Sequence, residues 1–199
     1  NWRIQSASCS AAGWLISMSD ENTLDYYNSA ALDYQATITA QETPALAEFA
    51  DQFQAGAKIL DLGCGPGHCA AVFAKHGLNV DATDASEEMI ALARKHKGVN
   101  AKVASFEDVS QTNEYDGIWA NFSLLHIEKS ALPSILKQLN TAAKPNALFH
   151  VGLKIGTGSR VDQLGRFYAY YSIDEIKAIA KAHKLKLEGD KTEIEALIE

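Results

Sequence analysis

Two acidic residues stand at the ends of successive apolar runs, and a cluster of glycines follows the first of them. Asp61 closes the run at residues 57–61, and alternating glycines then occupy positions 63–67. Asp84 follows the next apolar run, at residues 78–83. Glycine lets the backbone approach a ligand closely and adopt positive φ, and the helix start after such a turn offers free N–H groups to an anion. The pattern predicts a cofactor whose ribose hydroxyls meet the second carboxylate.

Two classes of cofactor fit this pattern. A dinucleotide needs the spacing G-x-G-x-x-G/A, which residues 65–70 satisfy when Ala70 takes the last position. Asp61 and Gly63 then have no role, and the carboxylate of Asp61 would repel a pyrophosphate. S-adenosylmethionine instead carries an ammonium, a carboxylate and a sulfonium group. An acid directly before the glycines suits that cationic end, so Asp61 favours S-adenosylmethionine over NAD.

Three segments resemble the motifs of the class I S-adenosylmethionine-dependent methyltransferases. They are Asp61-Leu62-Gly63-Cys64-Gly65-Pro66-Gly67, Val80-Asp81-Ala82-Thr83-Asp84-Ala85-Ser86-Glu87-Glu88-Met89 and Tyr115-Asp116-Gly117-Ile118-Trp119-Ala120-Asn121-Phe122. The resemblance covers about residues 24–190, and the first two motifs together are specific. It implies an α/β fold with a Rossmann-like, doubly wound, seven-stranded sheet of order 3-2-1-4-5-7-6, whose last strand is antiparallel and whose two faces are covered by helices. It also implies transfer of a methyl group to an acceptor.

The resemblance assigns cofactor contacts by position. The expected cofactor-binding residues are Tyr27, Asp61, Gly63, Cys64, Gly65, Asp84, Ala85, Met89, Ser105, Phe106, Asn121 and Phe122. The glycine turn would hold the methionine part, Asp61 the ammonium (directly or through water) and Asp84 both ribose hydroxyls. Ala85 and Met89 would line the adenine, and the Asn121 carbonyl would face the ammonium. Tyr27 and Phe122 offer aromatic faces to the sulfonium.

One position departs from the family pattern. The family usually has Asp after the third strand, where it accepts a hydrogen bond from the adenine amino group. Ser105 stands there in this chain, with Phe106 next. A serine oxygen accepts such a bond more weakly, and the phenylalanine ring packs on the adenine.

His126 is the candidate catalytic residue, because it follows the fourth predicted strand near the expected acceptor. Two interpretations stay open for it: a general base, or a cap for the helical region beyond. Methyl transfer needs a base only where the acceptor must lose a proton, so the sequence does not choose between them.

The segment at residues 154–171 leaves the fifth predicted strand beside the cofactor pocket. Its candidate substrate-binding residues are Lys154, Arg160, Arg166 and Tyr168. The guanidinium group of arginine makes paired hydrogen bonds to carboxylate, phosphate or sulfate. A cationic loop in a chain of net charge −7 therefore predicts a small anionic or strongly polar acceptor. Pairing of Asp162 with Arg160 or Arg166 is the structural alternative.

Alternating strands and helices position these residues. The expected strands are at residues 57–61, 78–83, 99–104, 115–120 and 146–153, with a hairpin at 185–198. The expected helices are at residues 23–40, 44–53, 68–76, 86–97, 130–141 and 172–183. Such alternation with short links predicts a parallel sheet covered on both faces, whose ligands bind at the carboxyl ends of the strands.

The domain organisation follows from the same pattern. Residues 1–17 are interpreted as a leader or disordered tail, and residues 18–199 as a single methyltransferase domain. Within it, residues 18–53 form an N-terminal helical lid and residues 57–199 the sheet core. Tyr27 and Tyr34 lie seven positions apart, and therefore on one helical face of the lid.

Composition limits the partners. The net charge of −7 disfavours nucleic acid, and no apolar run is long enough for a membrane span. Three cysteines without metal-ligand spacing predict reduced thiols, no metal site and a cytoplasmic protein. A monomer or a homodimer is expected. A nucleobase amino-methyltransferase is disfavoured, because Asn121 is followed by Phe122-Ser123-Leu124 rather than by two prolines. The alternatives are a non-catalytic S-adenosylmethionine-binding protein and a nicotinamide-dependent oxidoreductase.

Overall fold

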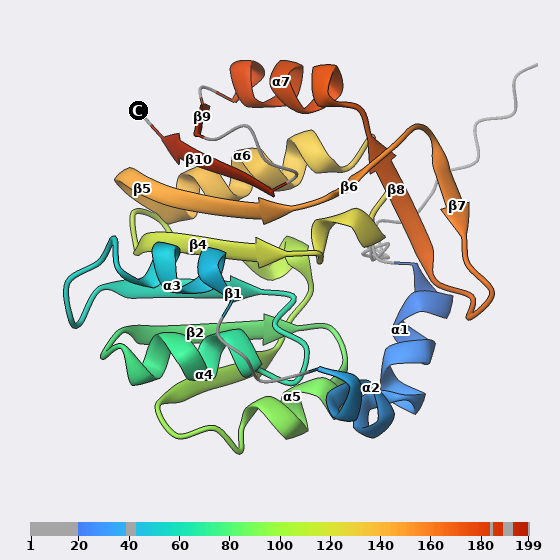
Figure 1. The fold of residues 1–199 in the computed structure, drawn as a ribbon, viewed down its shortest axis with the longest axis horizontal. Coiled ribbons are helices and arrows are strands. Elements are labelled where there is room, and N and C mark those ends of the chain that lie inside the picture. Colours follow the sequence, from blue (N-terminus) through green and yellow to red (C-terminus); the bar gives the residue numbers. More distant parts are fainter. Residues whose placement is uncertain (1–19, 39–42, 184, 189–192, 199) are drawn as a thin grey trace, which may run out of the picture.

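The computed structural model describes residues 20–38, 43–183, 185–188 and 193–198, so the predicted tail at 1–17 lies outside them. The strands of its main sheet are β1 Lys58–Leu62, β2 Asn79–Asp84, β3 Val99–Val103, β4 Tyr115–Asn121, β5 Ala143–Gly152, β9 Leu185–Glu188 and β10 Glu193–Ile198. Their hydrogen-bonded order is β3-β2-β1-β4-β5-β10-β9, in which the first five are parallel and β10 is antiparallel to β5. The α/β Rossmann-like prediction with a central parallel sheet is confirmed (Figure 1).

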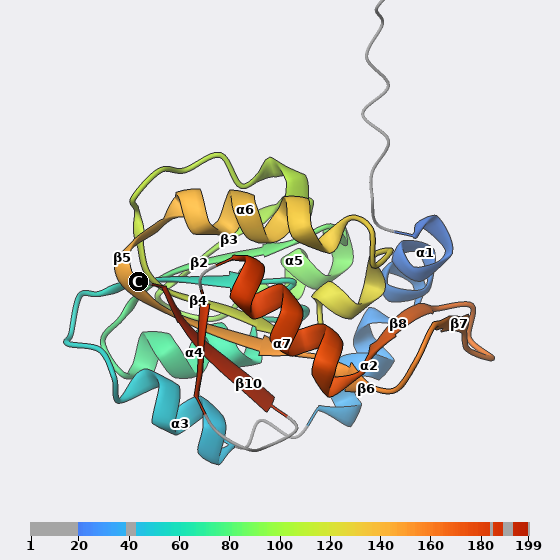
Figure 2. The ribbon, with the colours of Figure 1, turned by 90° about the horizontal axis from the view of Figure 1, so that it is seen from above.

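Helices cover both faces of this sheet. They are α3 Pro44–Ala50, α4 His68–Lys75 and α5 Glu87–Ala93 on one face, and α6 Leu132–Ala142 and α7 Ile173–Ala182 on the other. Figure 2 shows α6 on one side and α3 and α4 on the opposite side. Five of the seven residues of β4 are buried, as is usual for a parallel strand packed on two faces. None of the helices in the described part of the chain is both long and apolar enough to cross a membrane.

Local sequence signals explain where the helices begin. Ser86 caps α5 by accepting a hydrogen bond from the backbone N–H of Met89, and Ser172 opens α7 with a capping box, both as predicted. The prediction was wrong at the end of α5. That helix ends at Ala93, so the basic residues expected in its last turn follow it instead.

The N-terminal segment that the sequence predicts as a lid, called the lid below, is broken in the middle. The sequence predicts one helix at residues 23–40, whereas the structure has α1 Glu21–Ser29 and α2 Ala31–Thr37. Ala30 leaves helical geometry with φ −107° and ψ 12°. The break lets Tyr27 and Tyr34 pack together on the buried pair Met89 and Leu92. Both helices lie beyond the arrowheads of the parallel strands (Figure 1).

The segment after the fifth strand is not the irregular loop expected from the sequence. It forms a small sheet of order β6-β8-β7, with β6 Lys154–Ile155, β7 Ser159–Val161 and β8 Phe167–Tyr171. Asp162 makes the turn between β7 and β8 by accepting hydrogen bonds from the backbone N–H groups of Leu164 and Arg166. The aromatic run of β8 suits a strand. Figure 1 shows this sheet near α1.

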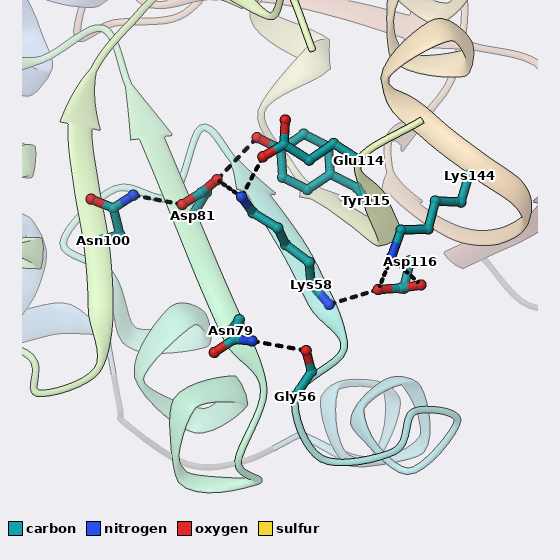
Figure 3. Close-up of polar contacts among 9 residues, drawn as sticks. All are labelled: Gly56, Lys58, Asn79, Asp81, Asn100, Glu114, Tyr115, Asp116 and Lys144. Carbon is teal, nitrogen blue, oxygen red and sulfur yellow. Dashed lines mark hydrogen bonds and ion pairs between the residues drawn. The ribbon is translucent and has the colours of Figure 1, made fainter. Parts of the chain in front are cut away.

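Near the other, amino-terminal ends of the strands, polar side chains join four of them (Figure 3). Asp81 of β2 accepts hydrogen bonds from Asn100 of β3 at 2.6 Å and from the Tyr115 hydroxyl of β4 at 3.2 Å. It also forms an ion pair with Lys58 of β1 at 3.2 Å. The backbone N–H of Lys58 donates to Asp116 at 2.8 Å. This network fixes the strands at the edge opposite the candidate site.

Candidate functional site

A cavity of about 220 Å³ lies where β1, β2 and β4 end, and α1 and α2 bound it on the far side. Eleven of the twelve expected cofactor-binding residues line it: Tyr27, Gly63, Cys64, Gly65, Asp84, Ala85, Met89, Ser105, Phe106, Asn121 and Phe122. His126 lines it too. Asp61 is 2% exposed and lies behind the wall. The fold therefore gathers residues from five separate segments around one space.

Glycine is required in the turn after β1. Gly63, Gly65 and Gly67 have φ of 70°, 54° and 80°, a region that other residues rarely adopt. A Cβ on Gly63 would lie 2.3 Å from the Cβ of Ser123. A Cβ on Gly65 would meet only Tyr34, at 3.9 Å, so the turn is open toward the cavity at this point.

Asp61 is a buried carboxylate with one oxygen that lacks a partner. Its Oδ2 has no hydrogen bond, although the carboxylate accepts one from the backbone of Ala70. Burial raises the pKa of Asp61 to about 7, and the nearby Asp84 charge adds to the shift. An unpaired buried oxygen is costly. The carboxylate suits a cationic group placed over the glycine turn.

Asp84 ends β2 with both carboxylate oxygens in use. Oδ2 accepts from the backbone N–H of Gly65 at 2.9 Å, and Oδ1 accepts from that of Ser86 at 2.9 Å. Burial raises the pKa of Asp84, and these N–H groups oppose that shift. A carboxylate has about four acceptor positions, so each oxygen can still accept a hydroxyl from the cavity.

Ser105 precedes the short 3-10 turn η1 Phe106–Asp108. Its backbone N–H and its hydroxyl both donate to Oδ2 of Asp108, at 2.7 and 2.8 Å. The hydroxyl hydrogen is thus committed to Asp108. Ser105 lines the cavity, and its hydroxyl can act there only as an acceptor.

Asn121 is the last residue of β4, and its side-chain amide lies between His150 and Gly152. Nε2 of His150 lies 3.2 Å from Oδ1 of Asn121, and the His150 ring stacks on Trp119 at 3.6 Å. A Cβ on Gly152 would come within 2.4 Å of that oxygen, so glycine leaves room for the amide. The next residue, Phe122, adopts φ 54° and is 45% exposed on the cavity wall.

His126 lies in the 3-10 turn η2 Leu124–His126 with both ring nitrogens engaged. Nδ1 lies 2.7 Å from the carbonyl oxygen of Phe167, which only accepts, so Nδ1 carries the hydrogen. Nε2 then accepts from the hydroxyl of Tyr27 at 3.1 Å. Burial lowers the pKa of His126 to about 4 and raises that of Tyr27. Both groups are therefore neutral at pH 7.

Arg166 pairs with Asp162, as the structural alternative supposed. Its Nε and one terminal nitrogen donate to Oδ2 of Asp162 at 2.9 and 2.6 Å. The guanidinium also stands 4.8 Å above the ring of Tyr26 on α1. A second link joins the same elements, because the backbone N–H of Phe167 donates to Oγ1 of Thr23 at 2.8 Å. The small sheet is thereby fastened to the lid.

The other candidate substrate residues contact aromatic rings. Nζ of Lys154 lies 3.6 Å from the centre of the Tyr168 ring, and Arg160 lies 4.5 Å above Tyr170. Tyr168 itself packs on His126 with ring centres 4.7 Å apart. The four candidate substrate residues, Lys154, Arg160, Arg166 and Tyr168, are not among the described residues that line the cavity.

Sequence reasoning missed several polar residues of the cavity wall, among them Ser123, Asp20 and His68. Ser123 donates from Oγ to the carbonyl of Leu62 at 2.6 Å, tight against Gly63. Asp20 and His68 each have a buried polar atom, Oδ1 and Nδ1, without a hydrogen bond. The position of His68, directly after the glycine cluster, was the one available signal.

Residues 59–146 match the family model of a methyltransferase domain. A curated relative, the ubiquinone biosynthesis O-methyltransferase of Hydrogenovibrio crunogenus, is 37% identical over 111 residues, which are 51% of this chain. The match spans 45% of the length of that relative. The resemblance to the class I methyltransferases is confirmed.

Two solved structures are similar to this chain in fold. The 1,6-didemethyltoxoflavin-N1-methyltransferase of Burkholderia thailandensis, with bound 1,6-didemethyltoxoflavin and S-adenosylhomocysteine, is similar with a TM-score of 0.73 and 20% identity, over 89% of this chain and 87% of that one. The magnesium protoporphyrin IX methyltransferase of Synechocystis PCC 6803, with bound S-adenosylmethionine, has a TM-score of 0.68 and 17% identity, over 90% and 98%. This chain thus shares the fold of these two proteins.

Proposed function

We propose that this chain is an S-adenosylmethionine-dependent methyltransferase that acts on a small molecule. The observation that carries the proposal is Asp61, a buried carboxylate with an unpaired oxygen behind an open glycine turn. A cation-bearing cofactor would stabilise it, whereas the pyrophosphate of a dinucleotide would not. The solved neighbours with S-adenosylmethionine or S-adenosylhomocysteine support the same cofactor.

The cavity residues fit the parts of this cofactor. Gly63, Cys64 and Gly65 would hold the methionine part, and Asp84 would accept from the ribose hydroxyls. The remaining contacts are proposed as follows: the ammonium at Asp61 and the Asn121 carbonyl, the adenine at Ala85, Met89, Ser105 and Phe106, and the sulfonium at Tyr27 and Phe122. When bound, the cofactor supplies an electrophilic methyl group. The chain contributes alignment and exclusion of water.

We propose His126 as the base, acting through Tyr27. The acceptor would give its proton to the Tyr27 oxygen while the Tyr27 hydroxyl hydrogen passes to Nε2 of His126. The hydrogen bond from Nδ1 to the carbonyl of Phe167 fixes the ring for this step. Because the pKa of His126 is lowered to about 4, the dyad suits an acceptor group that is already acidic.

We further propose a small anionic or polar acceptor, recognised with the help of Lys154, Arg160, Arg166 and Tyr168. The support is their place in the small sheet, which contacts both His126 and the lid. The neighbour with bound 1,6-didemethyltoxoflavin supports a small acceptor. In the sheet, we take β10 and β9 as the seventh and sixth strands of the family order 3-2-1-4-5-7-6, with β6, β7 and β8 as an addition.

Calorimetry and turnover test the proposal. We expect S-adenosylmethionine and S-adenosylhomocysteine to bind and NAD to give no heat. Adding fractions of a small-molecule extract should then convert S-adenosylmethionine to S-adenosylhomocysteine, as followed by mass spectrometry. Binding without conversion in any fraction would favour the non-catalytic alternative, and NAD binding alone would overturn the cofactor.

A further inference from the structure

His150 of β5 is a buried imidazole to which the proposed reaction gives no role. It is 1% exposed, and its ring stacks on that of Trp119 at an interplanar angle of 13°. The two residues stand opposite each other on the neighbouring strands β4 and β5. Trp119 packs edge-on against Phe49 and Phe73 in turn. The plane of the His150 ring is therefore fixed by the core beneath the cavity.

A histidine at this place is unfavourable for stability. Its Nδ1 is buried without a hydrogen-bond partner among the described residues, and an unpaired buried polar atom destabilises the folded state. Burial lowers the pKa of His150 to about 4, so the ring is neutral at pH 7. A phenylalanine would stack on Trp119 without burying a polar atom. The contact that only a polar residue makes here is the hydrogen bond of Nε2 with Oδ1 of Asn121, at 3.2 Å.

That hydrogen bond determines which end of the Asn121 amide is free. A carbonyl oxygen only accepts, so Nε2 of His150 carries the hydrogen and donates it. Gly152 leaves room for Oδ1 on the same side. Nδ2 of Asn121 has no partner among the described residues, yet it is not one of the buried polar atoms that lack a partner. It is therefore accessible, in a residue that lines the cavity.

We propose that His150 is a positioning residue, which holds the Asn121 amide so that Nδ2 donates a hydrogen bond to the methyl acceptor in the cavity. The inference rests on the proposed function, because it needs an acceptor beside the cofactor. The resemblance gives a role only to the backbone carbonyl of Asn121 and none to its side chain. An amide N–H does not suit the cofactor ammonium, which also only donates. The acceptor molecule therefore carries an oxygen or nitrogen lone pair close to the group that is methylated.

The tautomer of His150 can be measured before the acceptor is identified. In protein labelled with ¹⁵N and bound to S-adenosylhomocysteine, long-range proton–nitrogen NMR spectra distinguish a hydrogen on Nε2 from one on Nδ1. We expect the hydrogen on Nε2, because Oδ1 of Asn121 needs a donor. A hydrogen on Nδ1 would turn the amide around, direct its oxygen to the cavity and overturn the inference.

Two substitutions of His150 separate positioning from packing. His150→Phe keeps a flat ring against Trp119 and removes the donor, whereas His150→Gln restores an N–H near the place of Nε2. The acceptor probe is the extract fraction that supports conversion of S-adenosylmethionine by wild type, used in serial dilution. We expect His150→Phe to lower kcat/KM for this acceptor about three- to tenfold, as for one lost hydrogen bond, and His150→Gln to recover most of it. The affinity for S-adenosylhomocysteine and the melting temperature should stay close to those of wild type.

Tyr171→Phe is the matched control and should behave as wild type. It also removes a buried polar atom without a partner while keeping the ring, and Tyr171 is not among the described residues that line the cavity. Unchanged turnover in His150→Phe, or an equal loss in both His150 variants, would overturn the inference. Weaker binding of S-adenosylhomocysteine by His150→Phe would also overturn it, because Nδ2 would then serve the cofactor. If wild type binds S-adenosylmethionine but converts it with no fraction, the proposed function fails, and this inference fails with it.

Discussion

Tyr27 of α1 donates its hydroxyl hydrogen to Nε2 of His126 across 3.1 Å. The two residues are far apart in the sequence, one in the lid and one after the fourth strand. Their bond closes the cavity on the side of the small sheet, since Nδ1 of His126 contacts Phe167 of β8. The lid, the main sheet and the small sheet therefore meet at one imidazole.

Replacing Tyr27 with Phe should weaken this closure. The ring is kept, but Nε2 of His126 loses its partner in a buried place. We expect the dissociation constant for S-adenosylhomocysteine to rise about three- to tenfold, the equivalent of ~1 kcal/mol. Tyr26→Phe is the control. It keeps the aromatic ring that contacts Arg166, and Tyr26 is not among the described residues that line the cavity. Equal affinities for the two variants would contradict a closing role for Tyr27.

Two glycines with the same backbone angle separate crowding from backbone strain. Gly63 has φ 70° and Gly158 φ 71°, but only a Cβ at Gly63 would collide, with Ser123 at 2.3 Å. Gly158→Ala should cost about 1–2 kcal/mol of unfolding free energy from the left-handed conformation alone. Gly63→Ala should cost about 1–3 kcal/mol more, from overpacking. Urea unfolding measures both, and equal losses would show that the turn relaxes around the added methyl.

Asp61→Asn should stabilise the ligand-free protein and weaken cofactor binding. The folded pKa of Asp61 is raised to about 7, while the unfolded chain ionises near 3.8. The folded state thus binds more protons between these values, so stability falls as pH rises from about 4 to 7. Asparagine carries no titrating group, so the variant does not lose this stability, and its melting temperature at pH 8 should be higher than that of wild type. The affinity for S-adenosylhomocysteine should fall at least tenfold, since the ammonium loses its charged partner. An unchanged affinity would remove Asp61 from the site.

The sequence predicted the parts of the site that depend on backbone position. Glycines between a strand and a helix, and acids at strand ends, could be placed from the order of the elements, so Gly63 and Asp84 were expected at the carboxyl ends of the strands, where they line the cavity. His68 was missed, because the sequence does not show that it lines the cavity or that its Nδ1 lacks a hydrogen bond. Those properties appear only when distant segments are packed.

The outer elements were harder for a similar reason. The small sheet at residues 154–171 was expected as a loop, since its strands are short and its glycines are frequent. Its pairing depends on the Asp162 turn and on contacts of Thr23 with Phe167, which join segments at opposite ends of the chain. The bend at Ala30 likewise follows from packing on α5 rather than from a breaking residue.

Asp81→Asn should destabilise the protein at neutral pH and have little effect in acid. Hydrogen bonds from Asn100, Lys58 and Tyr115 hold the pKa of Asp81 below its ordinary 3.8 although burial opposes them. Its contribution is therefore present above about pH 4 and is lost as pH falls through the folded pKa. We expect a loss of about 1–2 kcal/mol at pH 7, from charged hydrogen bonds. Urea unfolding at pH 7 and pH 3 measures it, and Asp33→Asn on the exposed side of α2 is the control. An equal loss at both pH values would contradict the ionic origin.

Arg166 and Asp162 form a pair whose two members can be tested against each other. The ion pair orients Arg166, whose guanidinium contacts Tyr26 of the lid. If fastening is the only role, Arg166→Gln and Asp162→Asn should lower the melting temperature and the cofactor affinity alike. If Arg166 also binds an anionic acceptor, only its own replacement removes the cation.

We expect the second outcome. Arg166→Gln should raise the KM of the acceptor found by turnover about tenfold or more, as for a lost charged hydrogen bond. Asp162→Asn frees the guanidinium from its carboxylate and should leave that KM unchanged or lower it. Steady-state kinetics with saturating S-adenosylmethionine distinguish the two, and calorimetry shows whether the cofactor still binds. If both variants lose cofactor affinity together and neither changes KM selectively, the anionic acceptor is contradicted, and Arg166 only holds β8 against α1.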